Sequence, residues 1–311
     1  MSDKIAVMIA NRDRPTELGL LLESLWHQTY RNFDIFILDD CSGTPIQNYH
    51  FLMCMINKLK SEGNRVFIER TPFNYGVSNA RQRLVEWALS IEEYPLMARF
   101  DDDVILDTQY IEKLLKVIDA GYDLASGVTP FMGQPQFERD PKFIYPVGNK
   151  VILDKEGNHL FNGDDCGMLY SHEEILPLHH FRSCALYKAK IHEKINYKTR
   201  LSKHGFREEQ IFSYKCIING FKLGLNTGAI SWHLLTPSGG ERFPNQQELV
   251  MLNQNIFEDW TKMAYEQYGD FIEKYNKMMG IKIDPLTDEE KAKSTNLAKM
   301  DGSNQIGTWQ S

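Results

Sequence analysis

The first half of the chain alternates short apolar runs with segments of helical periodicity, and this alternation restricts the possible folds more than any other feature. The apolar runs predict buried strands at Ile5–Ala10, Asp34–Leu38, Val66–Ile68, Leu96–Phe100 and Leu124–Val128. The segments between them predict helices that begin at Pro15 and cover Val77–Ser90 and Thr108–Ala120. Strands and helices that alternate at this spacing favour an α/β fold, with a mostly parallel central sheet flanked by helices.

The second half is less regular. Residues 130–180 are rich in Gly, Pro, Asp and His, and they predict loops with one hairpin. Beyond them the sequence predicts a helix, two short strands and a long helix, at Phe206–Asn219, Lys222–Leu225, Ala229–His233 and Gln246–Met279. After Asp284-Pro285 the composition becomes polar, which is typical of a flexible tail.

Composition excludes several classes of protein. The 311 residues, 42% of them hydrophobic, are enough for one well-cored α/β domain and an appendage. A formal net charge of −7 argues against binding nucleic acid or an anionic membrane through a broadly basic face. The N-terminus does not resemble a secretory signal, and no run approaches the roughly 20 apolar residues of a transmembrane helix. Five separated cysteines without a CxxC pair indicate reduced thiols in a cytoplasmic protein.

Acidic residues follow two of the predicted strands. Asp39-Asp40 ends one strand, and Asp101-Asp102-Asp103 ends another. Ligands of open parallel sheets bind at the carboxyl ends of strands, and three adjacent carboxylates repel one another unless a cation neutralises them. In an extended run Asp101 and Asp103 share one side, which predicts an oxygen cradle for Mn²⁺ or Mg²⁺. Such an ion would neutralise a diphosphate. The alternative is a solvated acidic turn.

Three further places could carry chemistry. Asn79 and Arg81 lie at the start of a predicted helix, a position that favours phosphate, although a capped helix with a surface arginine would look the same. Glu208 and Glu209 lie where the chain enters another predicted helix. Glu209 could act as a general base there or be an ordinary acid of a first helical turn. His233 ends a strand before a Gly-rich loop. An imidazole beside carboxylates would favour Mn²⁺, although a lone histidine is more often structural.

The order of these motifs is more specific than any one of them. The chain contains, in sequence, DDxS, NxGxSNAR, DDD, a Glu pair before a helix, and Trp-His. This order, with the segments Leu25–Tyr30 and Phe33–Ser42, resembles the inverting family-2 glycosyltransferases of the GT-A fold. The resemblance runs from about Ile5 to His233. It implies a Rossmann-like GT-A domain at 1–240, with a nucleotide-binding half at 1–128 and an acceptor half at 129–240. A C-terminal helical extension at 241–283 and a flexible tail at 284–311 follow.

The resemblance also implies residue roles. Glu209 corresponds to the catalytic base, with Glu208 beside it, and the metal ligands are Asp103, Asp101 and His233. The residues implied at the nucleotide and donor are Ala10, Asn11, Arg12, Asp39, Asp40, Asn79, Arg81, Asp101, Asp102 and Arg242. The family usually has Asp where this chain has Glu209, so placement of the acceptor can differ. The implied cofactor is Mn²⁺ or Mg²⁺, and the implied donor is a nucleoside-diphosphate sugar, with a UDP-sugar favoured.

Other interpretations remain open. A sugar nucleotidyltransferase would need a Gly-rich loop where this chain has Asn11–Pro15, and a dinucleotide oxidoreductase would need GxGxxG. A non-catalytic nucleotide-sugar binding module, or a zinc protein that uses His172, His179 and His180, would differ in class. The acceptor hydroxyl could belong to a glycan, a lipid carrier, a protein or a modified nucleic-acid base. The C-terminal helices could pack on the core, dock a partner or form a homodimer.

Overall fold

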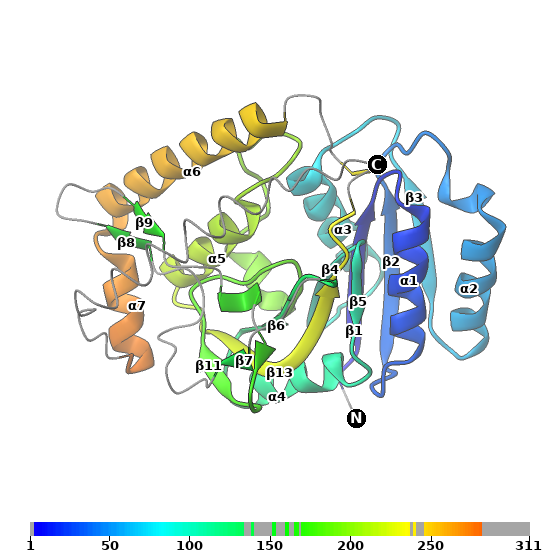
Figure 1. Cartoon of the computed structure of the whole chain (residues 1–311), viewed down its shortest axis with the longest axis horizontal. Coiled ribbons are helices and arrows are strands. Elements are labelled where there is room, and N and C mark those ends of the chain that lie inside the picture. The colour runs from blue at the N-terminus through cyan, green and yellow to red at the C-terminus, as the bar shows by residue number, and fades with distance from the viewer. Residues whose placement is uncertain are drawn as a thin grey trace.

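The computed structural model describes residues 3–133, 138–139, 151–153, 159–161, 165–167, 169–236, 239–240 and 246–281. A central sheet is flanked by helices on both faces, as predicted (Figure 1). Its helices are α1 (Pro15–Trp26), α2 (His50–Ser61), α3 (Val77–Ile91), α4 (Tyr110–Asp119), α5 (Glu208–Ile218), α6 (Gln246–Tyr268) and α7 (Phe271–Met279). Short 3₁₀ turns lie at Ile46–Asn48, Asp165–Gly167 and Ala189–Glu193.

The strands form one large sheet and two small pairs. The large sheet contains β1 (Ile5–Asn11), β2 (Phe33–Asp39), β3 (Val66–Arg70), β4 (Leu96–Asp101), β5 (Val104–Leu106), β6 (Leu124–Val128), β11 (Ile175–Pro177), β12 (Ala185–Lys188) and β13 (Leu223–His233). The small pairs join β7 (Glu138–Arg139) to β10 (Leu169–Tyr170), and β8 (Val151–Leu153) to β9 (His159–Phe161). The antiparallel β8–β9 pair agrees with the hairpin expected within residues 130–180.

The sheet order is β11-β13-β6-β12-β4-β1-β2-β3, and β5 pairs with β13. The half formed by β4, β1, β2 and β3 is parallel throughout, as the sequence predicts. The unpredicted strand β12 then enters antiparallel between β4 and β6, so the whole sheet is mixed. This insertion places the ends of β13 and β4, which are far apart in sequence, on the same side of the molecule.

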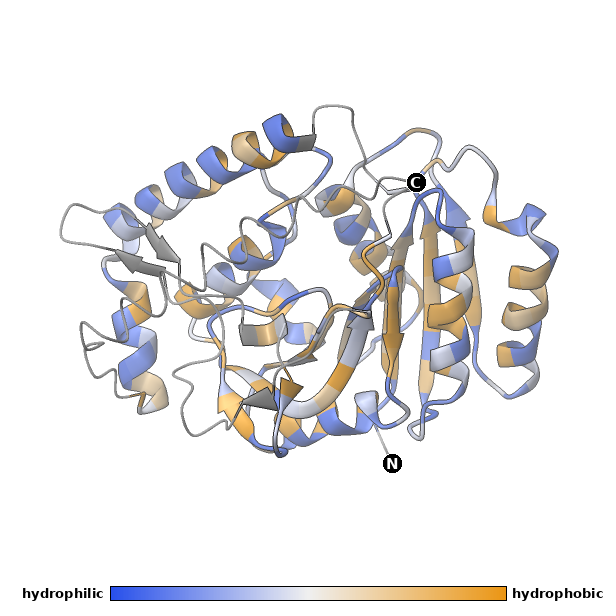
Figure 2. Cartoon of the chain, in the orientation of Figure 1, coloured by the Kyte–Doolittle hydropathy of each residue, from blue (hydrophilic) through white to orange (hydrophobic). Residues whose placement is uncertain are grey.

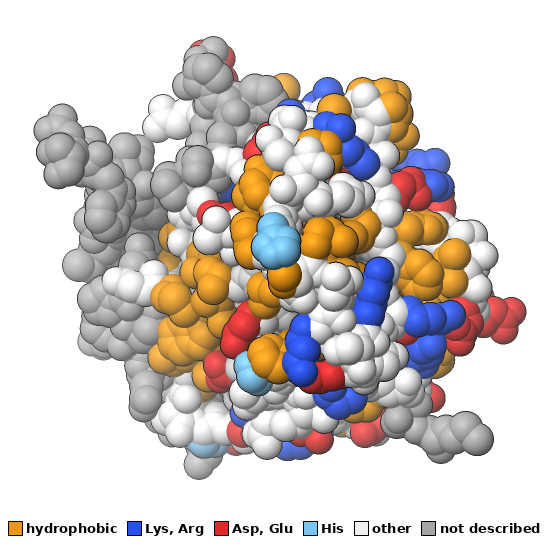
Figure 3. All heavy atoms as spheres, turned by 90° about the vertical axis from the view of Figure 1, so that its right-hand side faces the viewer, with side chains coloured by type: hydrophobic (Ala, Val, Ile, Leu, Met, Phe, Trp, Pro, Cys, Tyr) orange, Lys and Arg blue, Asp and Glu red, His pale blue; other side chains and the backbone are white. Residues whose placement is uncertain are grey.

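Side-chain alternation along the strands creates two hydrophobic cores. Ile5, Val7 and Ile9 of β1 face α1, α2 and α4, whereas Ala6 and Met8 face α3 and the C-terminal helices. The hydropathy of the helices agrees with these two cores: α1 and α2 turn their apolar sides toward the strands (Figure 2). On the face that α2 covers, hydrophobic side chains lie among charged ones at the surface (Figure 3).

Helix α2 is absent from the sequence-based expectation. Its buried residues Leu52, Ile56 and Leu59 do have helical spacing, but exposed Lys and Asn residues dilute the pattern. The single long helix expected over Gln246–Met279 is wrong in one respect. Gly269 has φ +69°, and the Asp270 side chain caps a new helix by accepting from the Glu273 N–H (2.7 Å).

The C-terminal helices pack back on the domain. Phe257, Ala264, Phe271 and Tyr275 are buried, and the Phe271 ring lies 5.6 Å from that of Tyr214 in α5. The aromatic side chains of Phe257, Phe271 and Tyr275 therefore belong to the core. Within the described residues, no helix has both the length and the hydropathy that crossing a membrane requires.

The two short strands expected at 222–225 and 229–233 form one strand, β13. Its register against β6 shifts between Leu225 and Ile230. Gly127 lies opposite this irregularity, and a Cβ atom there would be 2.2 Å from the carbonyl oxygen of Ala229 and 2.7 Å from the Tyr110 ring. The close approach lets β13 bend while it carries His233 to the candidate site.

We predict that Gly127→Ala destabilises the fold by about 1–3 kcal/mol or more, because the backbone of β13 must move to admit the methyl group. Urea-induced unfolding would measure the change. Gly43→Ala is the matched control, since its new Cβ would meet only the Asp13 carboxylate at 3.5 Å. Equal stability of both variants would show that the β6–β13 contact is not tightly packed.

Candidate active site

The predicted acids meet because three parallel strands end together. Asn11 at the end of β1 pairs with Asp39 of β2, and Ala10 pairs with Asp101 of β4. The carboxyl ends of parallel strands lie on one edge of a sheet. The register therefore brings the first strand and both acidic motifs to that edge, as the sequence predicts.

Asp102 is held by the loop after β1. Its carboxylate accepts from the Asn11 amide (2.8 Å) and from Arg14 Nη1 (2.9 Å), and the same nitrogen of Arg14 lies 2.9 Å from Asp103 Oδ2. Burial raises the pKa of Asp102, although the charge of Arg14 opposes this shift. Burial works against the charge on Arg14, but Asp102 and Asp103 outweigh it and raise its pKa. This buried contact fixes the acidic triplet against the loop.

Asp101, Asp103 and His233 form a group whose donor atoms all lie within 4.8 Å of one another. The β5–β13 pairing supplies the histidine, since His233 is opposite Val104, the residue after the triplet. His233 Nε2 is 3.4 Å from Asp103 Oδ1, and its buried Nδ1 has no hydrogen-bond partner among the residues that the structure describes. Burial lowers the pKa of His233 despite the adjacent Asp103 and Asp101, which favours the neutral imidazole.

Two carboxylates and a neutral imidazole suit a divalent cation. Oxygen ligands lie about 2.1 Å from Mg²⁺, so ligand atoms up to about 4.2 Å apart can share one ion. The 4.8 Å limit of this group is close to that span. Asp103 Oδ2 faces Arg14, which leaves Oδ1 directed at His233. The residues therefore fit the divalent metal site expected from the sequence.

A second cluster joins β4 to the start of α5 through two arginines. Arg99 Nη1 contacts Glu208 at 2.8 Å, and its Nη2 contacts Glu209 at 3.3 Å and Asp101 at 3.4 Å. Arg81 of α3 contacts Glu208 and lies 2.6 Å from Asp101. Arg99 is 2% exposed, and its charge also lies over the Phe181 ring at 4.9 Å.

The two glutamates are placed differently. The Glu208 side chain is 1% exposed and is enclosed between the two arginines, whereas the Glu209 side chain is 22% exposed. Burial raises the pKa of Glu209; Arg99 opposes this shift, and the negative charges of Glu208 and Asp101 add to it. Glu209 therefore combines access to solvent with a carboxylate that accepts a proton more readily than usual.

Asp40 fixes the loop before α3. Its carboxylate accepts from the Thr71 hydroxyl (3.0 Å) and from the backbone N–H groups of Tyr75 (2.8 Å) and Gly76 (2.9 Å). Asp40 is only 4% exposed. In this structure the residue positions the loop, and contact with a nucleoside base stays a prediction.

Asp39 and Arg12 organise the turn after β2. Asp39 is fully buried and accepts from the backbone N–H groups of Ser42 (2.9 Å) and Ile46 (3.3 Å). Arg12 donates to the carbonyl oxygens of Asp40 (2.8 Å) and Cys41 (3.2 Å). The predicted nucleotide residues of the first two loops therefore lie together, and they hold one another in place.

One predicted residue, Asn79, lies apart from this cluster. Asn79 is two positions before Arg81 and so points to another side of α3, where it is exposed and donates to the carbonyl of Tyr75 (3.1 Å). Asn79 therefore lies on a different side of α3 from Arg81, and its contact with a nucleotide stays a prediction. Arg242 lies outside the described residues. Among the described residues, the histidines of the alternative zinc cluster do not belong to a metal-ligating group: His179 contacts Asn276, and His172 contacts Glu174.

Sequence reasoning assigned no role to Arg14 or Arg99, although both contact the acidic motifs. Arg99 had a visible signal, since a charged residue inside the apolar run Leu96–Phe100 must find a partner when that run is buried. Its partner, Glu208, is 109 residues away. No local pattern shows that pairing.

A family model described as glycosyl transferase family 2 matches residues 5–175, more than half of the chain. The chain belongs to glycosyl transferase family 2. A relative from Haemophilus influenzae, described as an uncharacterized glycosyltransferase, is 31% identical over 118 residues. The match spans 37% of this chain and 34% of that protein, so the chain matches about a third of its relative's length.

Solved structures with similar folds are glycosyltransferases of the GT-A type. GalNAc-T7 with UDP, GalNAc and Mn²⁺ has a TM-score of 0.59 at 15% identity, over 90% of this chain and 55% of that one. TarS 1–349 of S. aureus in complex with UDP-GlcNAc has a TM-score of 0.53 at 12% identity, over 79% of this chain and 63% of that one. At these identities the likeness concerns the fold, and it confirms the GT-A prediction.

We predict that Asp103→Ala weakens Mn²⁺ binding by more than about tenfold. Loss of a group that merely supports a ligand costs 10–100-fold, so loss of a ligand should cost at least as much. Titration of the free Mn²⁺ signal by electron paramagnetic resonance would measure this affinity. Asp119→Ala, which removes an exposed carboxylate at the end of α4, is the control. Unchanged affinity in Asp103→Ala would argue against the metal assignment.

Proposed function

We propose that the chain is a metal-dependent, inverting glycosyltransferase that moves a sugar from a nucleoside-diphosphate sugar, with a UDP-sugar favoured, to an acceptor hydroxyl. One observation carries this proposal: Arg99 contacts both Asp101 of the candidate metal group and the solvent-accessible Glu209. One guanidinium therefore joins the candidate metal group to a carboxylate with a raised pKa. The UDP in the GalNAc-T7 structure and the UDP-GlcNAc in the TarS structure support the choice of donor.

Asp101, Asp103 and His233 would hold the metal. When bound, a divalent cation draws negative charge off the leaving diphosphate. Arg14 lies beside these ligands, since it contacts Asp103 Oδ2 at 2.9 Å. It can offset the charge of the acidic triplet, and a guanidinium there can also face phosphate oxygens.

Glu209 is the proposed general base. An accessible carboxylate with a raised pKa can take the proton of an acceptor hydroxyl as that oxygen attacks the anomeric carbon. The bond from the anomeric carbon to the diphosphate breaks in the same displacement, so the configuration inverts. Arg99 holds the Glu209 carboxylate and leaves part of it exposed.

Glu208 is better suited to positioning than to proton transfer. Its carboxylate is 1% exposed and contacts both Arg81 and Arg99, so an acceptor hydroxyl cannot approach it in this conformation. We therefore assign Glu208 as the residue that positions the two arginines.

We predict that Glu209→Gln lowers the transfer rate by about 10²–10⁴-fold, the usual contribution of a general base, while Mn²⁺ and UDP still bind. The amide keeps the size of the side chain but cannot accept the proton. Parallel assays of sugar transfer, of free UDP release without acceptor, and of UDP binding would separate these effects. Near wild-type turnover in Glu209→Gln would reject the base assignment.

We predict that kcat/KM falls as the pH drops through the raised pKa of Glu209, at a pH well above the ordinary glutamate value of 4.5. Below that pKa the carboxylate is protonated and cannot act as a base. A pH–rate profile from about pH 5 to 9, with UDP affinity measured at each pH as the control, would test the sign. A rate that is flat across this range while affinity is constant would contradict it.

A further inference from the structure

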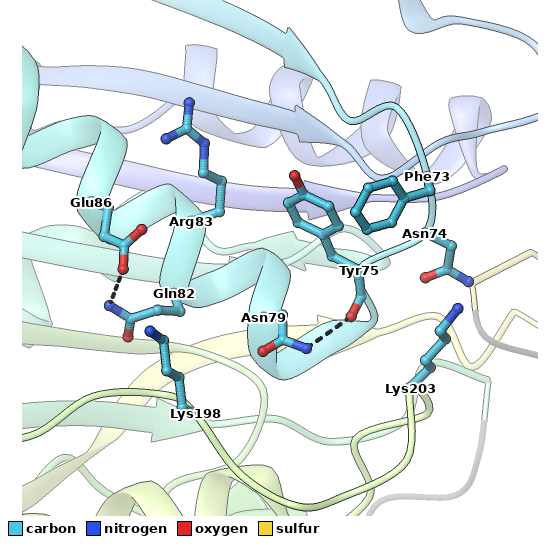
Figure 4. Close-up of a pocket in the computed structure, with 9 residues that line it drawn as sticks. All are labelled: Phe73, Asn74, Tyr75, Asn79, Gln82, Arg83, Glu86, Lys198 and Lys203. Carbon is cyan, nitrogen blue, oxygen red and sulfur yellow. Dashed lines mark hydrogen bonds between the residues drawn. The ribbon is translucent and has the colours of Figure 1, made fainter.

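A cavity of about 570 Å³ lies on the outer side of α3, in the size range of small-molecule sites. We call it the α3 pocket. Its walls are the loop before α3, the first turns of α3 and the segment before α5, as Figure 4 shows. The lining residues are Phe73, Asn74, Tyr75, Asn79, Gln82, Arg83, Glu86, Lys198 and Lys203. Only Asn79 among them has an expected role.

One wall of the α3 pocket is aromatic. The rings of Phe73 and Tyr75 lie 4.8 Å apart, and Phe73 is 62% exposed although it is a large apolar residue. A ring left in solvent offers an apolar face with partial negative charge, which suits the C–H face of a sugar ring. Two side-chain amides also line the pocket: that of Asn79 points to the Tyr75 carbonyl, and that of Gln82 points to Glu86 (Figure 4).

The opposite wall is basic. Lys198 and Lys203 are exposed, and neither has an ion-pair partner in the part of the chain that the structure describes. Arg83 is already paired with Glu69 through two 3.0 Å contacts, and Glu86 accepts from Gln82 (3.0 Å). Apart from the paired Arg83, the lining thus holds two lysines and one acid. The pocket favours an anionic ligand.

The α3 pocket shares its walls with the candidate active site. Tyr75 lines the pocket, while its backbone N–H binds Asp40 (2.8 Å). The Lys203 carbonyl accepts from the Val77 N–H at the start of α3 (3.0 Å), and the segment that carries Lys203 continues into Glu208 and Glu209. A ligand bound in the pocket would therefore lie beside the elements that position the proposed base.

We propose that the α3 pocket binds an anionic saccharide segment of the acceptor, one that carries carboxylate or phosphate groups and lies away from the reacting hydroxyl. This inference rests on the proposed function. Sugar rings would stack on Phe73 and Tyr75, and the negative groups would face Lys198 and Lys203. The pocket would select acceptors by charge without touching the reacting atoms.

Calorimetric titration would test the pocket with two anionic probes, tetragalacturonate and phosphorylated maltotetraose, and with their neutral partners, methyl-esterified tetragalacturonate and maltotetraose. We expect at least one anionic probe to bind more tightly than its neutral partner. Lys198→Ala/Lys203→Ala should lose about tenfold in affinity for the anionic probe, and Phe73→Ala should also weaken it. The charge-matched control is Lys60→Ala/Lys262→Ala, two exposed lysines on α2 and α6.

Equal binding of charged and neutral probes, an equal loss in the control variant, or binding of hexauridylate but of no saccharide would overturn the inference. Free UDP release from a UDP-sugar, measured on the same samples without acceptor, separates it from the proposed function. Normal UDP release without probe binding would reject the role proposed for the α3 pocket and leave the proposed function in place. Absence of UDP release with every UDP-sugar in the presence of Mn²⁺ would reject the proposed function instead.

Discussion

The ion pairs of Arg99 are the interaction on which the candidate site depends. One buried guanidinium joins a strand-end aspartate, Asp101, to two glutamates that begin α5. Loss of one partner from such a buried cluster typically costs about 3–5 kcal/mol, because the remaining charges stay buried and uncompensated. The arrangement therefore holds α5 against β4 tightly. It also places Glu209 at a fixed position relative to the acidic triplet, as the proposed displacement requires of a base and of the groups that face the leaving diphosphate.

A second arginine works in the same way on the other side of the triplet. Arg14 holds Asp102 and Asp103, Arg81 and Arg99 hold Asp101, and His233 arrives from β13. Three carboxylates can lie side by side at low exposure because the fold surrounds them with positive groups. The sheet makes this possible, since β1, β2 and β4 end at one edge and the irregular β6–β13 pairing bends the histidine toward it.

The sequence predicted the parts of this site that local patterns encode. Apolar runs marked β1, β2, β4 and β6, and acids directly after two of those runs identified the edge at which they meet. The order of motifs then related His233 and Glu209 to the same edge. Contacts between distant, individually ordinary residues could not be predicted this way. The Arg99–Glu208 pair, the antiparallel entry of β12 and the α3 pocket all depend on tertiary packing, for which one sequence carries no periodic signal. The break at Gly269 was visible as a glycine, but helical periodicity on both sides of it outweighed that signal.

The central claim is that the strand-end acids hold a metal next to the donor diphosphate. Crystals grown with Mn²⁺ and UDP, with anomalous scattering measured at the manganese edge, would test it most directly. We expect one strong anomalous peak within bonding distance of Asp103, with Asp101 and His233 beside it and the diphosphate in contact with the ion. Bound UDP with no manganese at this group, or manganese bound at a different group, would contradict the account.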